Sequence, residues 1–276
     1  MTYRALLLSA VRTLSGAGVP NPETDAAMLM SFLTGRNPLE LRLDMDTGPD
    51  AKTESAFSDL LRRRAAREPL QYLIGSVPFC GLSFHVDSRV LIPRPETGLL
   101  TEWAAEELRP IPAPSILDLC CGSGCIGLTL KSRFPHAHVM LTDISGDALA
   151  VAKENARMLE LNAAFVQGDL FSSVHGSFDL IISNPPYIPS DQCASLQTEV
   201  LYEPSAALDG GQDGLDFYRR IVAESRSFLR EEGRLMLEVG FDEADKVHDL
   251  LNKADFHRVE IRKDLSGIDR MLMACK

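Results

Sequence analysis

The chain has 276 residues, of which 45% are hydrophobic and 24% are charged, and its formal net charge is −11. This length and composition indicate a soluble globular protein with one large or two modest domains and a full hydrophobic core. The acidic balance excludes a protein that is held on duplex DNA or on a membrane surface by an overall positive field. No stretch approaches the roughly 18 apolar residues that a membrane-spanning helix needs.

Residues 1–76 form the first predicted domain, which is small and helical. Apolar residues recur at helical spacing over residues 3–14. Another helix is predicted over residues 51–67, and the basic run Arg62-Arg63-Arg64 lies near its end, with Arg67. Because cations are favourable at the C-terminal end of a helix, we favour a solvated helix end here. The alternative is a contact for an acidic partner or for RNA.

Residues 77–96 form a predicted hairpin and linker. The segment 78–86 contains two short apolar stretches broken by a glycine, which predicts a β-hairpin. Two prolines flank Arg94 and precede Glu96, and this pattern predicts a stiff, extended connector. The connector is either a plain interdomain linker or a segment whose Arg94 and Glu96 line a cleft.

Over residues 97–276 strands alternate with helices, which predicts a doubly wound α/β fold with a mainly parallel, seven-stranded sheet. The predicted strands cover residues 116–120, 138–142, 164–167, 178–183, 234–239, 257–261 and 271–274. The predicted helices cover residues 97–108, 125–134, 146–159, 215–229 and 243–252. In such sheets ligands bind at the C-terminal ends of the strands.

A glycine-rich loop follows the first strand of this sheet. Gly122, Gly124 and Gly127 match the GxGxxG pattern, which by itself fits a dinucleotide site with Asp143 on a ribose hydroxyl. A pyrophosphate, however, prefers a helix N-terminus without an acid, and Asp118 lies just before the loop. The carboxylate suits a cationic ligand, so the sequence favours S-adenosylmethionine, with Asp143 on both ribose hydroxyls.

The adenine ring of this cofactor is expected at Gly168-Asp169-Leu170-Phe171, after the third strand. Asp169 or the backbone would lie near the amino group, and Leu170 or Phe171 against the ring face. For Phe171 a position in the core is an equal alternative. The complete set of predicted cofactor contacts is Asp118, Cys120, Cys121, Gly122, Ser123, Gly124, Asp143, Asp169, Leu170 and Asn184.

Six cysteines are present, and three of them, Cys120, Cys121 and Cys125, crowd the glycine-rich loop. They lack the paired spacing and the fourth ligand of a zinc site, so we predict no metal. We expect reduced thiols in a cytosolic protein, packed as small, soft side chains under a turn.

The segment Asn184-Pro185-Pro186-Tyr187 follows the apolar strand 178–183. An asparagine side chain offers both a carbonyl acceptor and an amide donor. The prolines restrict the backbone, so the asparagine is held still, and the tyrosine ring is able to stack on a flat group. The combination predicts a site for a planar, uncharged amino group. The alternative is a strand end closed by a rigid turn.

Motifs along nearly the whole chain resemble the protein-(glutamine-N5) methyltransferases that modify peptide chain release factors. They are Arg67–Leu73, Leu91–Thr97, the Asp118 loop, Ser183–Ile188, Tyr202-Glu203-Pro204, Leu208–Leu215, Leu237–Gly240 and Asp264–Arg270. The Asn-Pro-Pro-Tyr motif occurs in several groups of amino-methyltransferases. The stretches around Arg94 and around Glu203 are far more specific to this family.

The resemblance implies methyl transfer from S-adenosylmethionine to the side-chain amide of the glutamine in the Gly-Gly-Gln motif of release factors, which tunes translation termination. It implies that the Asn184 oxygen and the Pro185 carbonyl accept the two amide hydrogens while Tyr187 packs over the amide plane. The implied catalytic and substrate-binding set is Asn184, Pro185, Pro186 and Tyr187, with Arg94 and Glu96 as further substrate contacts. It also implies a cytoplasmic monomer, docked on release factors by its N-terminal helices, with no stable nucleic acid and no membrane.

The chain departs from the family pattern in two places. The family usually has Gly-Thr where this chain has Cys120-Cys121. Because cysteine is larger than glycine, we expect a backbone there that does not rely on a positive φ, with cofactor binding preserved by Gly122 and Gly124. The family tends to carry an acid at the position of Gly98, so any function of that acid in the family is not assigned to this chain.

Three alternatives stay open at this point. A nucleic-acid amino-methyltransferase shares the planar amino target but requires a basic or aromatic surface and base flipping. An inactive cofactor-binding or scaffolding protein is supported only by the changed Cys120-Cys121 positions. An NAD enzyme is supported by GxGxxG alone and is opposed by Asp118.

Overall fold

The computed structural model describes all residues from 1 to 276, and the chain divides into two compact units. The first unit contains residues 1–76 together with residues 197–202. The second unit contains residues 77–196 and 203–276. The chain therefore leaves the second unit once, contributes a six-residue segment to the first, and returns.

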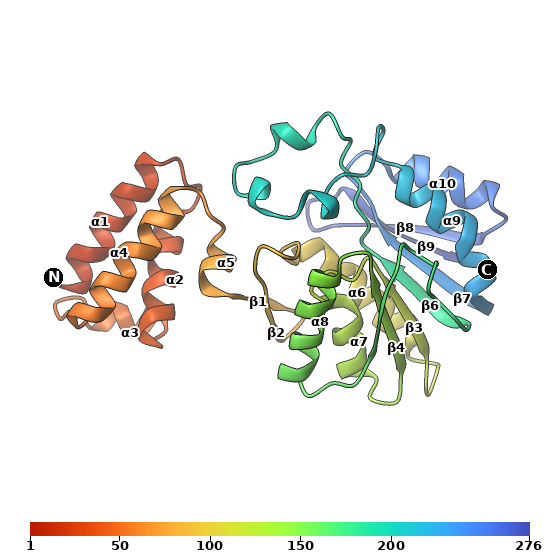
Figure 1. The fold of residues 1–276 in the computed structure, drawn as a ribbon, viewed down its shortest axis with the longest axis horizontal. Coiled ribbons are helices and arrows are strands. Elements are labelled where there is room, and N and C mark those ends of the chain that lie inside the picture. Colours follow the sequence, from red (N-terminus) through yellow and green to blue (C-terminus); the bar gives the residue numbers. More distant parts are fainter. The chain divides into compact units, whose positions relative to one another are not determined.

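The first unit is a set of helices, drawn in red and orange in Figure 1. Its helices are α1 (Tyr3–Gly16), α2 (Pro22–Thr34), α3 (Pro38–Leu43), α4 (Ala51–Ala65) and α5 (Leu70–Ile74). Buried apolar side chains from α1, α2 and α4, including Leu14, Leu29 and Phe57, form its core. Helices α3 and α5 have only six and five residues, too few to show a helical period in the sequence.

The basic end of α4 binds acids of its own unit. Arg64 is 4% exposed, and its guanidinium is 2.7 Å from an oxygen of Asp25 and 2.9 Å from an oxygen of Glu199. Arg67 also donates to Glu199, at 2.6 Å. Burial opposes it, but the hydrogen bonds from Arg67 and Arg64 lower the pKa of Glu199 to about 2. The predicted solvated helix end is therefore wrong for Arg64.

The second unit begins with the predicted hairpin, made of β1 (Ser76–Phe79) and β2 (Leu82–His85). Its main sheet has seven strands: β3 (Ser115–Leu119), β4 (His138–Asp143), β5 (Ala164–Gln167), β6 (Phe178–Ser183), β7 (Leu229–Glu238), β8 (His257–Lys263) and β9 (Asp269–Cys275). They lie in the order β5-β4-β3-β6-β7-β9-β8, and β9 runs antiparallel to both of its neighbours. The doubly wound, mainly parallel seven-stranded sheet that was predicted is confirmed.

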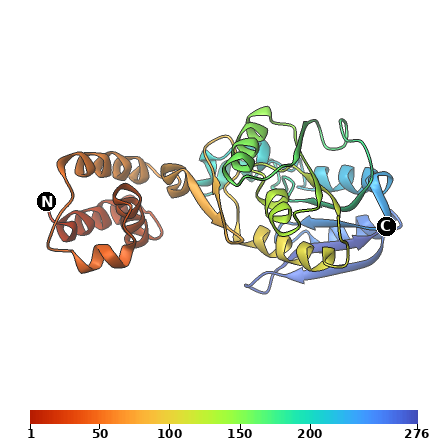
Figure 2. The ribbon, with the colours of Figure 1, turned by 90° about the horizontal axis from the view of Figure 1, so that it is seen from below.

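Helices cover both faces of this sheet. They are α6 (Pro95–Leu108), α7 (Cys125–Arg133), α8 (Gly146–Met158), α9 (Asp216–Phe228) and α10 (Ala244–Lys253). Helices α6, α7 and α8 lie on one face and α9 and α10 on the other (Figures 1 and 2). Because both faces are covered, β3 and β6 read as nearly continuous apolar runs. Three short 3₁₀ turns, η1 (Cys193–Ser195), η2 (Val200–Tyr202) and η3 (Ser205–Ala207), lie between β6 and α9.

The order of the strands positions a ligand site. From β3 the chain proceeds outward to β4 and β5, and then returns to pair β6 on the other side of β3. A reversal of this kind opens a crevice at the C-terminal ends of the central strands. Asp118 in β3 and the segment after Ser183 in β6 both lie at this edge.

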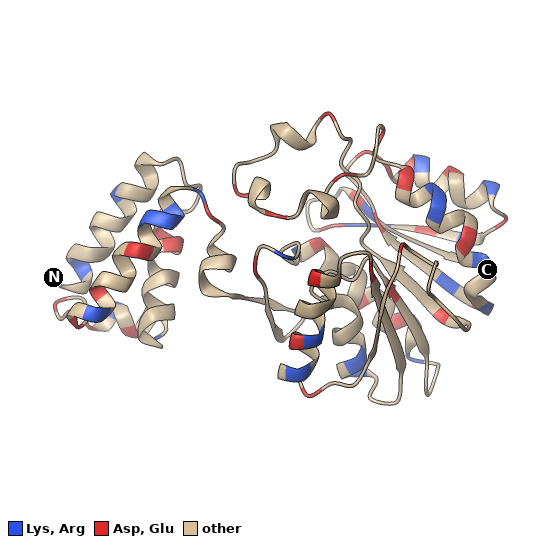
Figure 3. Cartoon of the chain, viewed as in Figure 1, with Lys and Arg blue, Asp and Glu red and all other residues tan.

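Charged residues of both signs are interspersed along helices such as α4 and α9 (Figure 3). None of the helices combines the length with the apolar character that crossing a membrane requires.

Candidate active site

A cavity of about 400 Å³ lies in the second unit, at the C-terminal ends of β4, β5 and β6. Its lining residues come from several loops and are Arg89, Val90, Leu91, Cys120, Gly122, Thr142, Asp143, Ile144, Ser145, Ala148, Gly168, Asp169, Leu170, Asn184, Pro186, Pro204, Ala206, Ala207, Asp209, Phe217 and Arg220. Six of the predicted cofactor contacts are among them: Cys120, Gly122, Asp143, Asp169, Leu170 and Asn184. The cavity lining does not include Asp118, Cys121, Ser123 or Gly124.

Asp118 lies beneath the glycine-rich loop and is fully buried. Its Oδ2 accepts a 2.8 Å hydrogen bond from the backbone N–H of Gly127, while its Oδ1 has no partner. Burial raises the pKa of Asp118 to about 7, against that hydrogen bond, and the charge of Asp143 raises it further. A buried carboxylate with an unpaired oxygen favours a cation beside it.

The Asp143 carboxylate fixes the backbone of the glycine-rich loop through a hydrogen bond. Its Oδ2 accepts from the backbone N–H of Gly122 at 2.9 Å, and its Oδ1 accepts from the backbone N–H of Ser145 at 2.9 Å. Burial raises the pKa of Asp143. A carboxylate has about four lone-pair positions, so these two bonds leave acceptor capacity toward the cavity.

Cys120 adopts the left-handed backbone conformation, with φ of 57°. The expectation that the backbone here does not rely on a positive φ was therefore wrong. The turn from β3 into the loop requires this conformation, and cysteine accepts the strain that glycine avoids. All six cysteines are free, and Cys121 and Cys125 are buried as small side chains. Burial raises the pKa of Cys120 above its usual range, which keeps its thiol protonated.

The turn after β5 places three consecutive residues in different surroundings. Asp169 lines the cavity, and its carboxylate forms an ion pair with Arg220 at 2.7 Å. Leu170 presents an apolar surface to the same cavity. Phe171 instead stacks on Phe228 with ring centroids 4.8 Å apart, within the core of the unit. The core position for Phe171 was one of the two alternatives.

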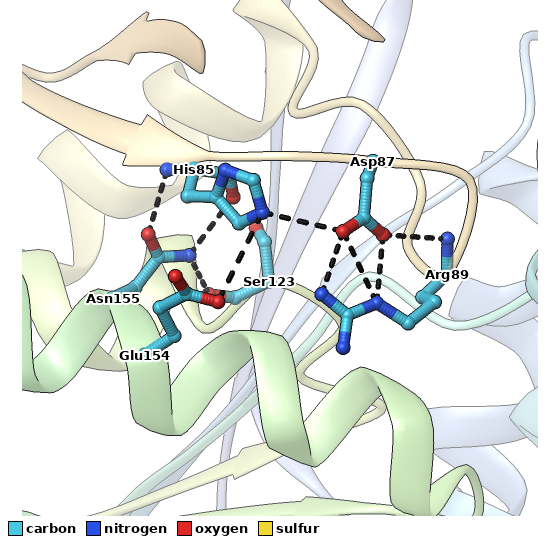
Figure 4. A network of polar contacts seen from close by, with 6 residues as sticks. All are labelled: His85, Asp87, Arg89, Ser123, Glu154 and Asn155. Carbon is cyan, nitrogen blue, oxygen red and sulfur yellow. Dashed lines mark hydrogen bonds and ion pairs between the residues drawn. The ribbon is translucent and has the colours of Figure 1, made fainter. Parts of the chain in front are cut away.

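A buried asparagine ties the hairpin to the glycine-rich loop, as Figure 4 shows. Asn155 of α8 accepts from the backbone N–H of His85 at 2.6 Å and donates to the carbonyl of His85 at 3.0 Å. It also donates to the carbonyl of Ser123 at 2.9 Å. Ser123 is thus held through its backbone, behind the cavity wall. Its predicted place as a cofactor contact stays a prediction.

Arg89, which lines the cavity, is fixed by its neighbour in the sequence (Figure 4). Asp87 accepts from the Arg89 guanidinium at 2.6 Å and from its backbone N–H at 3.0 Å. The pairing with Arg89 lowers the pKa of Asp87 to about 2 despite partial burial. Sequence reasoning missed Arg89; the spacing of an acid two residues before an arginine was the only signal.

The Asn-Pro-Pro-Tyr segment begins where β6 ends. Asn184 lines the cavity, and its Nδ2 donates to the Thr97 hydroxyl at 3.1 Å. Both prolines are buried, and Pro186 also faces the cavity. The Tyr187 hydroxyl accepts from Arg270 at 3.2 Å. Burial raises the pKa of Tyr187, so the phenol stays neutral.

Gly210 lies directly against the backbone of this segment. Ile188 pairs with Asp209, with hydrogen bonds of 2.9 Å to the Leu208 carbonyl and 2.8 Å from the Gly210 N–H. A Cβ on Gly210 would lie 2.6 Å from the Cα of Tyr187. Only glycine allows this approach, so the loop clamps the backbone immediately after the motif.

Comparisons with known proteins bear on this site. A family model described as "PrmC N-terminal domain" matches residues 5–75, and one described as "Methyltransferase small domain" matches residues 99–211. A release factor glutamine methyltransferase of Deinococcus radiodurans is 42% identical over 99% of this chain and 98% of its own length. One of Moorella thermoacetica is 41% identical over 99% and 98%. The chain belongs to the release factor glutamine methyltransferase family.

Solved structures agree on the fold of this methyltransferase. A methyltransferase of Pyrococcus furiosus superimposes with a TM-score of 0.55 at 19% identity, covering 71% of this chain and 89% of its own. A T. thermophilus 16S rRNA methyltransferase in complex with AdoMet and guanosine gives a TM-score of 0.54 at 20% identity, covering 73% and 49%. At such identities the likeness concerns the fold alone.

The residues of the site fit the cofactor of a methyltransferase, S-adenosylmethionine. The unpaired oxygen of Asp118 suits a cationic group, and Asp143 has acceptor capacity for hydroxyl groups. Leu170 supplies an apolar wall, and the loop glycines allow close approach. The protein is an S-adenosylmethionine-dependent methyltransferase.

Arg94 and Glu96 of the methyltransferase do not line the cavity. Arg94 forms an ion pair with Glu203, whose other oxygen accepts from the backbone N–H of Ile92 at 3.0 Å. Glu203 is 6% exposed. These bonds join the connector to the segment before η3. The substrate contacts predicted for Arg94 and Glu96 stay predictions.

Proposed function

We propose that this enzyme transfers a methyl group to the side-chain amide nitrogen of the glutamine in the Gly-Gly-Gln motif of peptide chain release factors. The observation that carries the proposal is the position of Asn184, whose side chain lines the cofactor cavity at the end of β6. Relatives named for this activity match the chain almost from end to end, which supports the same substrate.

The cofactor contacts are proposed from the cavity and from the loop beneath it. Asp118 would lie beside the cationic part, and Asp143 would accept from the ribose hydroxyls. Asp169 and Leu170 would flank the adenine. When bound, S-adenosylmethionine supplies an electrophilic methyl group on a sulfonium.

The protein contributes positioning more than acid–base chemistry. An amide nitrogen is a poor nucleophile because its lone pair is delocalised into the carbonyl. Acceptance of both N–H groups by the Asn184 oxygen and the Pro185 carbonyl would orient that nitrogen, and Tyr187 would pack on the amide plane. A strong base is not required before transfer, because the proton leaves afterwards. Rate enhancement then comes from orientation and fixed dipoles.

The helical unit is proposed to dock the release factor. Its helices α2 and α3 expose apolar side chains, among them Phe32 at 48% and Leu43 at 79%. These surfaces suit a protein partner better than a nucleic acid. We place the reaction in the cytoplasm, where release factors act, and propose that the enzyme works as a monomer.

Mass spectrometry of a release factor tests the proposal. After incubation with the enzyme and S-adenosylmethionine, we expect the Gly-Gly-Gln peptide to gain the mass of one CH₂ group, located on the glutamine. Asn184→Ala should lose this transfer and bind S-adenosylmethionine nearly as tightly as the wild type. Near-normal turnover by Asn184→Ala would refute the assigned role of Asn184.

A second experiment distinguishes this proposal from its main alternative, a nucleic-acid amino-methyltransferase. The same incubation is run with adenine- and guanine-containing DNA and RNA in place of the release factor. Methylated nucleobases together with an unmodified release factor would overturn the proposal and leave a nucleic-acid amino-methyltransferase.

A further inference from the structure

Two buried residues stand behind Asn184 in a chain of hydrogen bonds. Thr97, in the first turn of α6, accepts from Asn184 Nδ2 at 3.1 Å. The Thr97 hydroxyl donates in turn to Oε2 of Glu238, the last residue of β7, at 2.6 Å. Thr97 is 2% exposed and Glu238 is 0% exposed, so water does not compete for these bonds.

The number of available protons determines which group donates and which accepts in this series of hydrogen bonds. A threonine hydroxyl has one proton, and a carboxylate only accepts. While Glu238 is ionised, Thr97 gives its proton to Glu238 and keeps only lone pairs for Asn184. Asn184 must then present its NH₂ group to Thr97. Its carbonyl oxygen is left for the other side, where the cavity lies.

We infer that Glu238 and Thr97 are positioning residues, which force the Asn184 amide into the orientation that offers its oxygen to the substrate. This inference rests on the proposed function, because that orientation is useful only for a target that carries N–H groups. An asparagine held only by packing is free to turn its amide. In half of its orientations the NH₂ group, which is a donor, would face the N–H groups of the substrate, which are also donors.

Several charged and titratable side chains surround Glu238. The charged and titratable groups that face it come from the starts of α6 and α7, the turn after β6, α9 and β9, and they are Arg94, Glu96, Cys125, Tyr187, Tyr218 and Arg270. The Arg270 guanidinium is 4.0 Å from Oε1, which has no hydrogen-bond partner. The Tyr218 hydroxyl donates to the backbone carbonyl of Glu238 at 2.9 Å.

Protonation of Glu238 would reverse the direction of the hydrogen bonds that link it through Thr97 to Asn184. Burial raises the pKa of Glu238 to about 7, against the Thr97 hydrogen bond and the charge of Arg270. A protonated Glu238 donates to Thr97, and the Thr97 proton then goes to Asn184, which must turn its oxygen inward. Turnover should therefore fall as the pH drops below about 7, without an equal loss of cofactor affinity.

Variants at residue 97 test the positioning role. Thr97→Val keeps the shape but removes the hydroxyl, and kcat on a release factor should fall about tenfold to a hundredfold. KM and the affinity for S-adenosylmethionine should change little. Thr97→Ser, which restores the hydroxyl, should recover kcat to within about threefold of the wild type. Thr101→Val is the matched control, because it removes a buried hydroxyl one turn further along α6 that bonds only to the Thr97 carbonyl.

The pH profile separates positioning from packing. Glu238→Gln offers Thr97 a carbonyl acceptor at every pH, so its kcat should lose the fall below about pH 7. A kcat for Thr97→Val equal to that of Thr101→Val, or an unchanged pH profile for Glu238→Gln, overturns the inference.

A readout without turnover distinguishes this inference from the proposed function. The side-chain amide signal of Asn184 in ¹⁵N NMR, assigned by its loss in Asn184→Ala, should shift with pH through about 7 in the wild type. It should not shift in Glu238→Gln. A wild-type signal that is independent of pH overturns the inference even if the release factor is methylated. A wild-type enzyme that leaves the release factor unmodified overturns the proposed function instead.

Discussion

The Oδ2 atom of Asp118 accepts a 2.8 Å hydrogen bond from the backbone N–H of Gly127, nine residues further along the chain. The contact leaves no room for a side chain at residue 127, because a Cβ there would lie 2.9 Å from the same oxygen. The acid before the loop and the last glycine of the loop therefore depend on each other. The glycine permits the carboxylate to lie beneath the start of α7, and the carboxylate satisfies one N–H of that helix end.

Gly127→Ala should weaken both folding and cofactor binding. The added Cβ would also lie 3.0 Å from Leu141, so the loop or the strand must move. We expect a loss of about 1–3 kcal/mol in the free energy of unfolding, measured by urea denaturation. Isothermal titration should show weaker binding of S-adenosylmethionine. The control is Gly16→Ala, since nothing lies within 4 Å of that position, and unchanged stability of Gly127→Ala would contradict the packing argument.

Asp118→Asn should alter the pH dependence of stability. The pKa of Asp118 is about 7 in the folded chain against 3.8 for an ordinary aspartate. Between these values the folded state binds a proton that the unfolded state does not, so this contribution to stability is complete below 3.8 and is lost as the pH rises through 7. The wild-type Tm should therefore fall between about pH 4 and pH 7, with little further change above pH 7, and Asp118→Asn should lose its share of that fall.

The same substitution should weaken cofactor binding about tenfold or more, because a neutral amide no longer attracts a cation. Titrations at fixed pH would measure it. Asp147→Asn, at an exposed position in α8, serves as the control for loss of one negative charge. Unchanged affinity in Asp118→Asn would remove Asp118 from the cofactor site.

Cys120→Gly should be nearly neutral. Glycine relieves the strain of the positive φ, but it also increases the entropy of the unfolded chain, so the change in unfolding free energy should stay within about 1 kcal/mol. Cys120→Val should cost about 2 kcal/mol, because a β-branched residue tolerates this conformation poorly. Urea denaturation of both variants measures the difference. Equal stabilities of the two variants would show that the backbone rearranges instead.

Asn155→Ala should be among the most damaging changes outside the cavity. It leaves the backbone N–H and carbonyl of His85 and the carbonyl of Ser123 without their partner, at a position that is fully buried. The expected loss is about 3 kcal/mol or more, with weaker cofactor binding because the loop is released. Asn162→Ala, at an exposed position, is the control. A Tm for Asn155→Ala that matches the control would argue against the clamp.

Much of the architecture could be predicted because local patterns were strong. The strands β5 and β6 have the predicted bounds, and the order of strands and helices gave the sheet. The short helices α3 and α5 were missed because five or six residues do not complete two turns. Arg64 was misjudged because its partners Asp25 and Glu199 are 39 and 135 residues away.

Some of the residues that line the cavity could also be predicted, because they lie in strong local patterns. Residues at strand ends, such as Asp143 and Asn184, follow from the alternation of strands and turns. Arg89, Phe217 and Arg220 come from the linker and from α9, and nothing local marks them. Thr97 and Glu238 lay inside family motifs, but their contact spans 141 residues and depends on the packing of α6 against the sheet.

By itself the sequence determined the class of fold, the cationic character expected of the cofactor and the family, since each depends on residues that are close along the chain. The tertiary structure decided the rest: that Cys120 adopts a positive φ, that Asp118 is buried with one unpaired oxygen, and that Asn184 is backed by Thr97 and Glu238. Burial and hydrogen-bond direction depend on residues brought together from distant parts of the chain. For that reason the Asn-Pro-Pro-Tyr motif indicates an amide clamp, while the orientation of its asparagine is settled by a helix and a strand elsewhere in the chain.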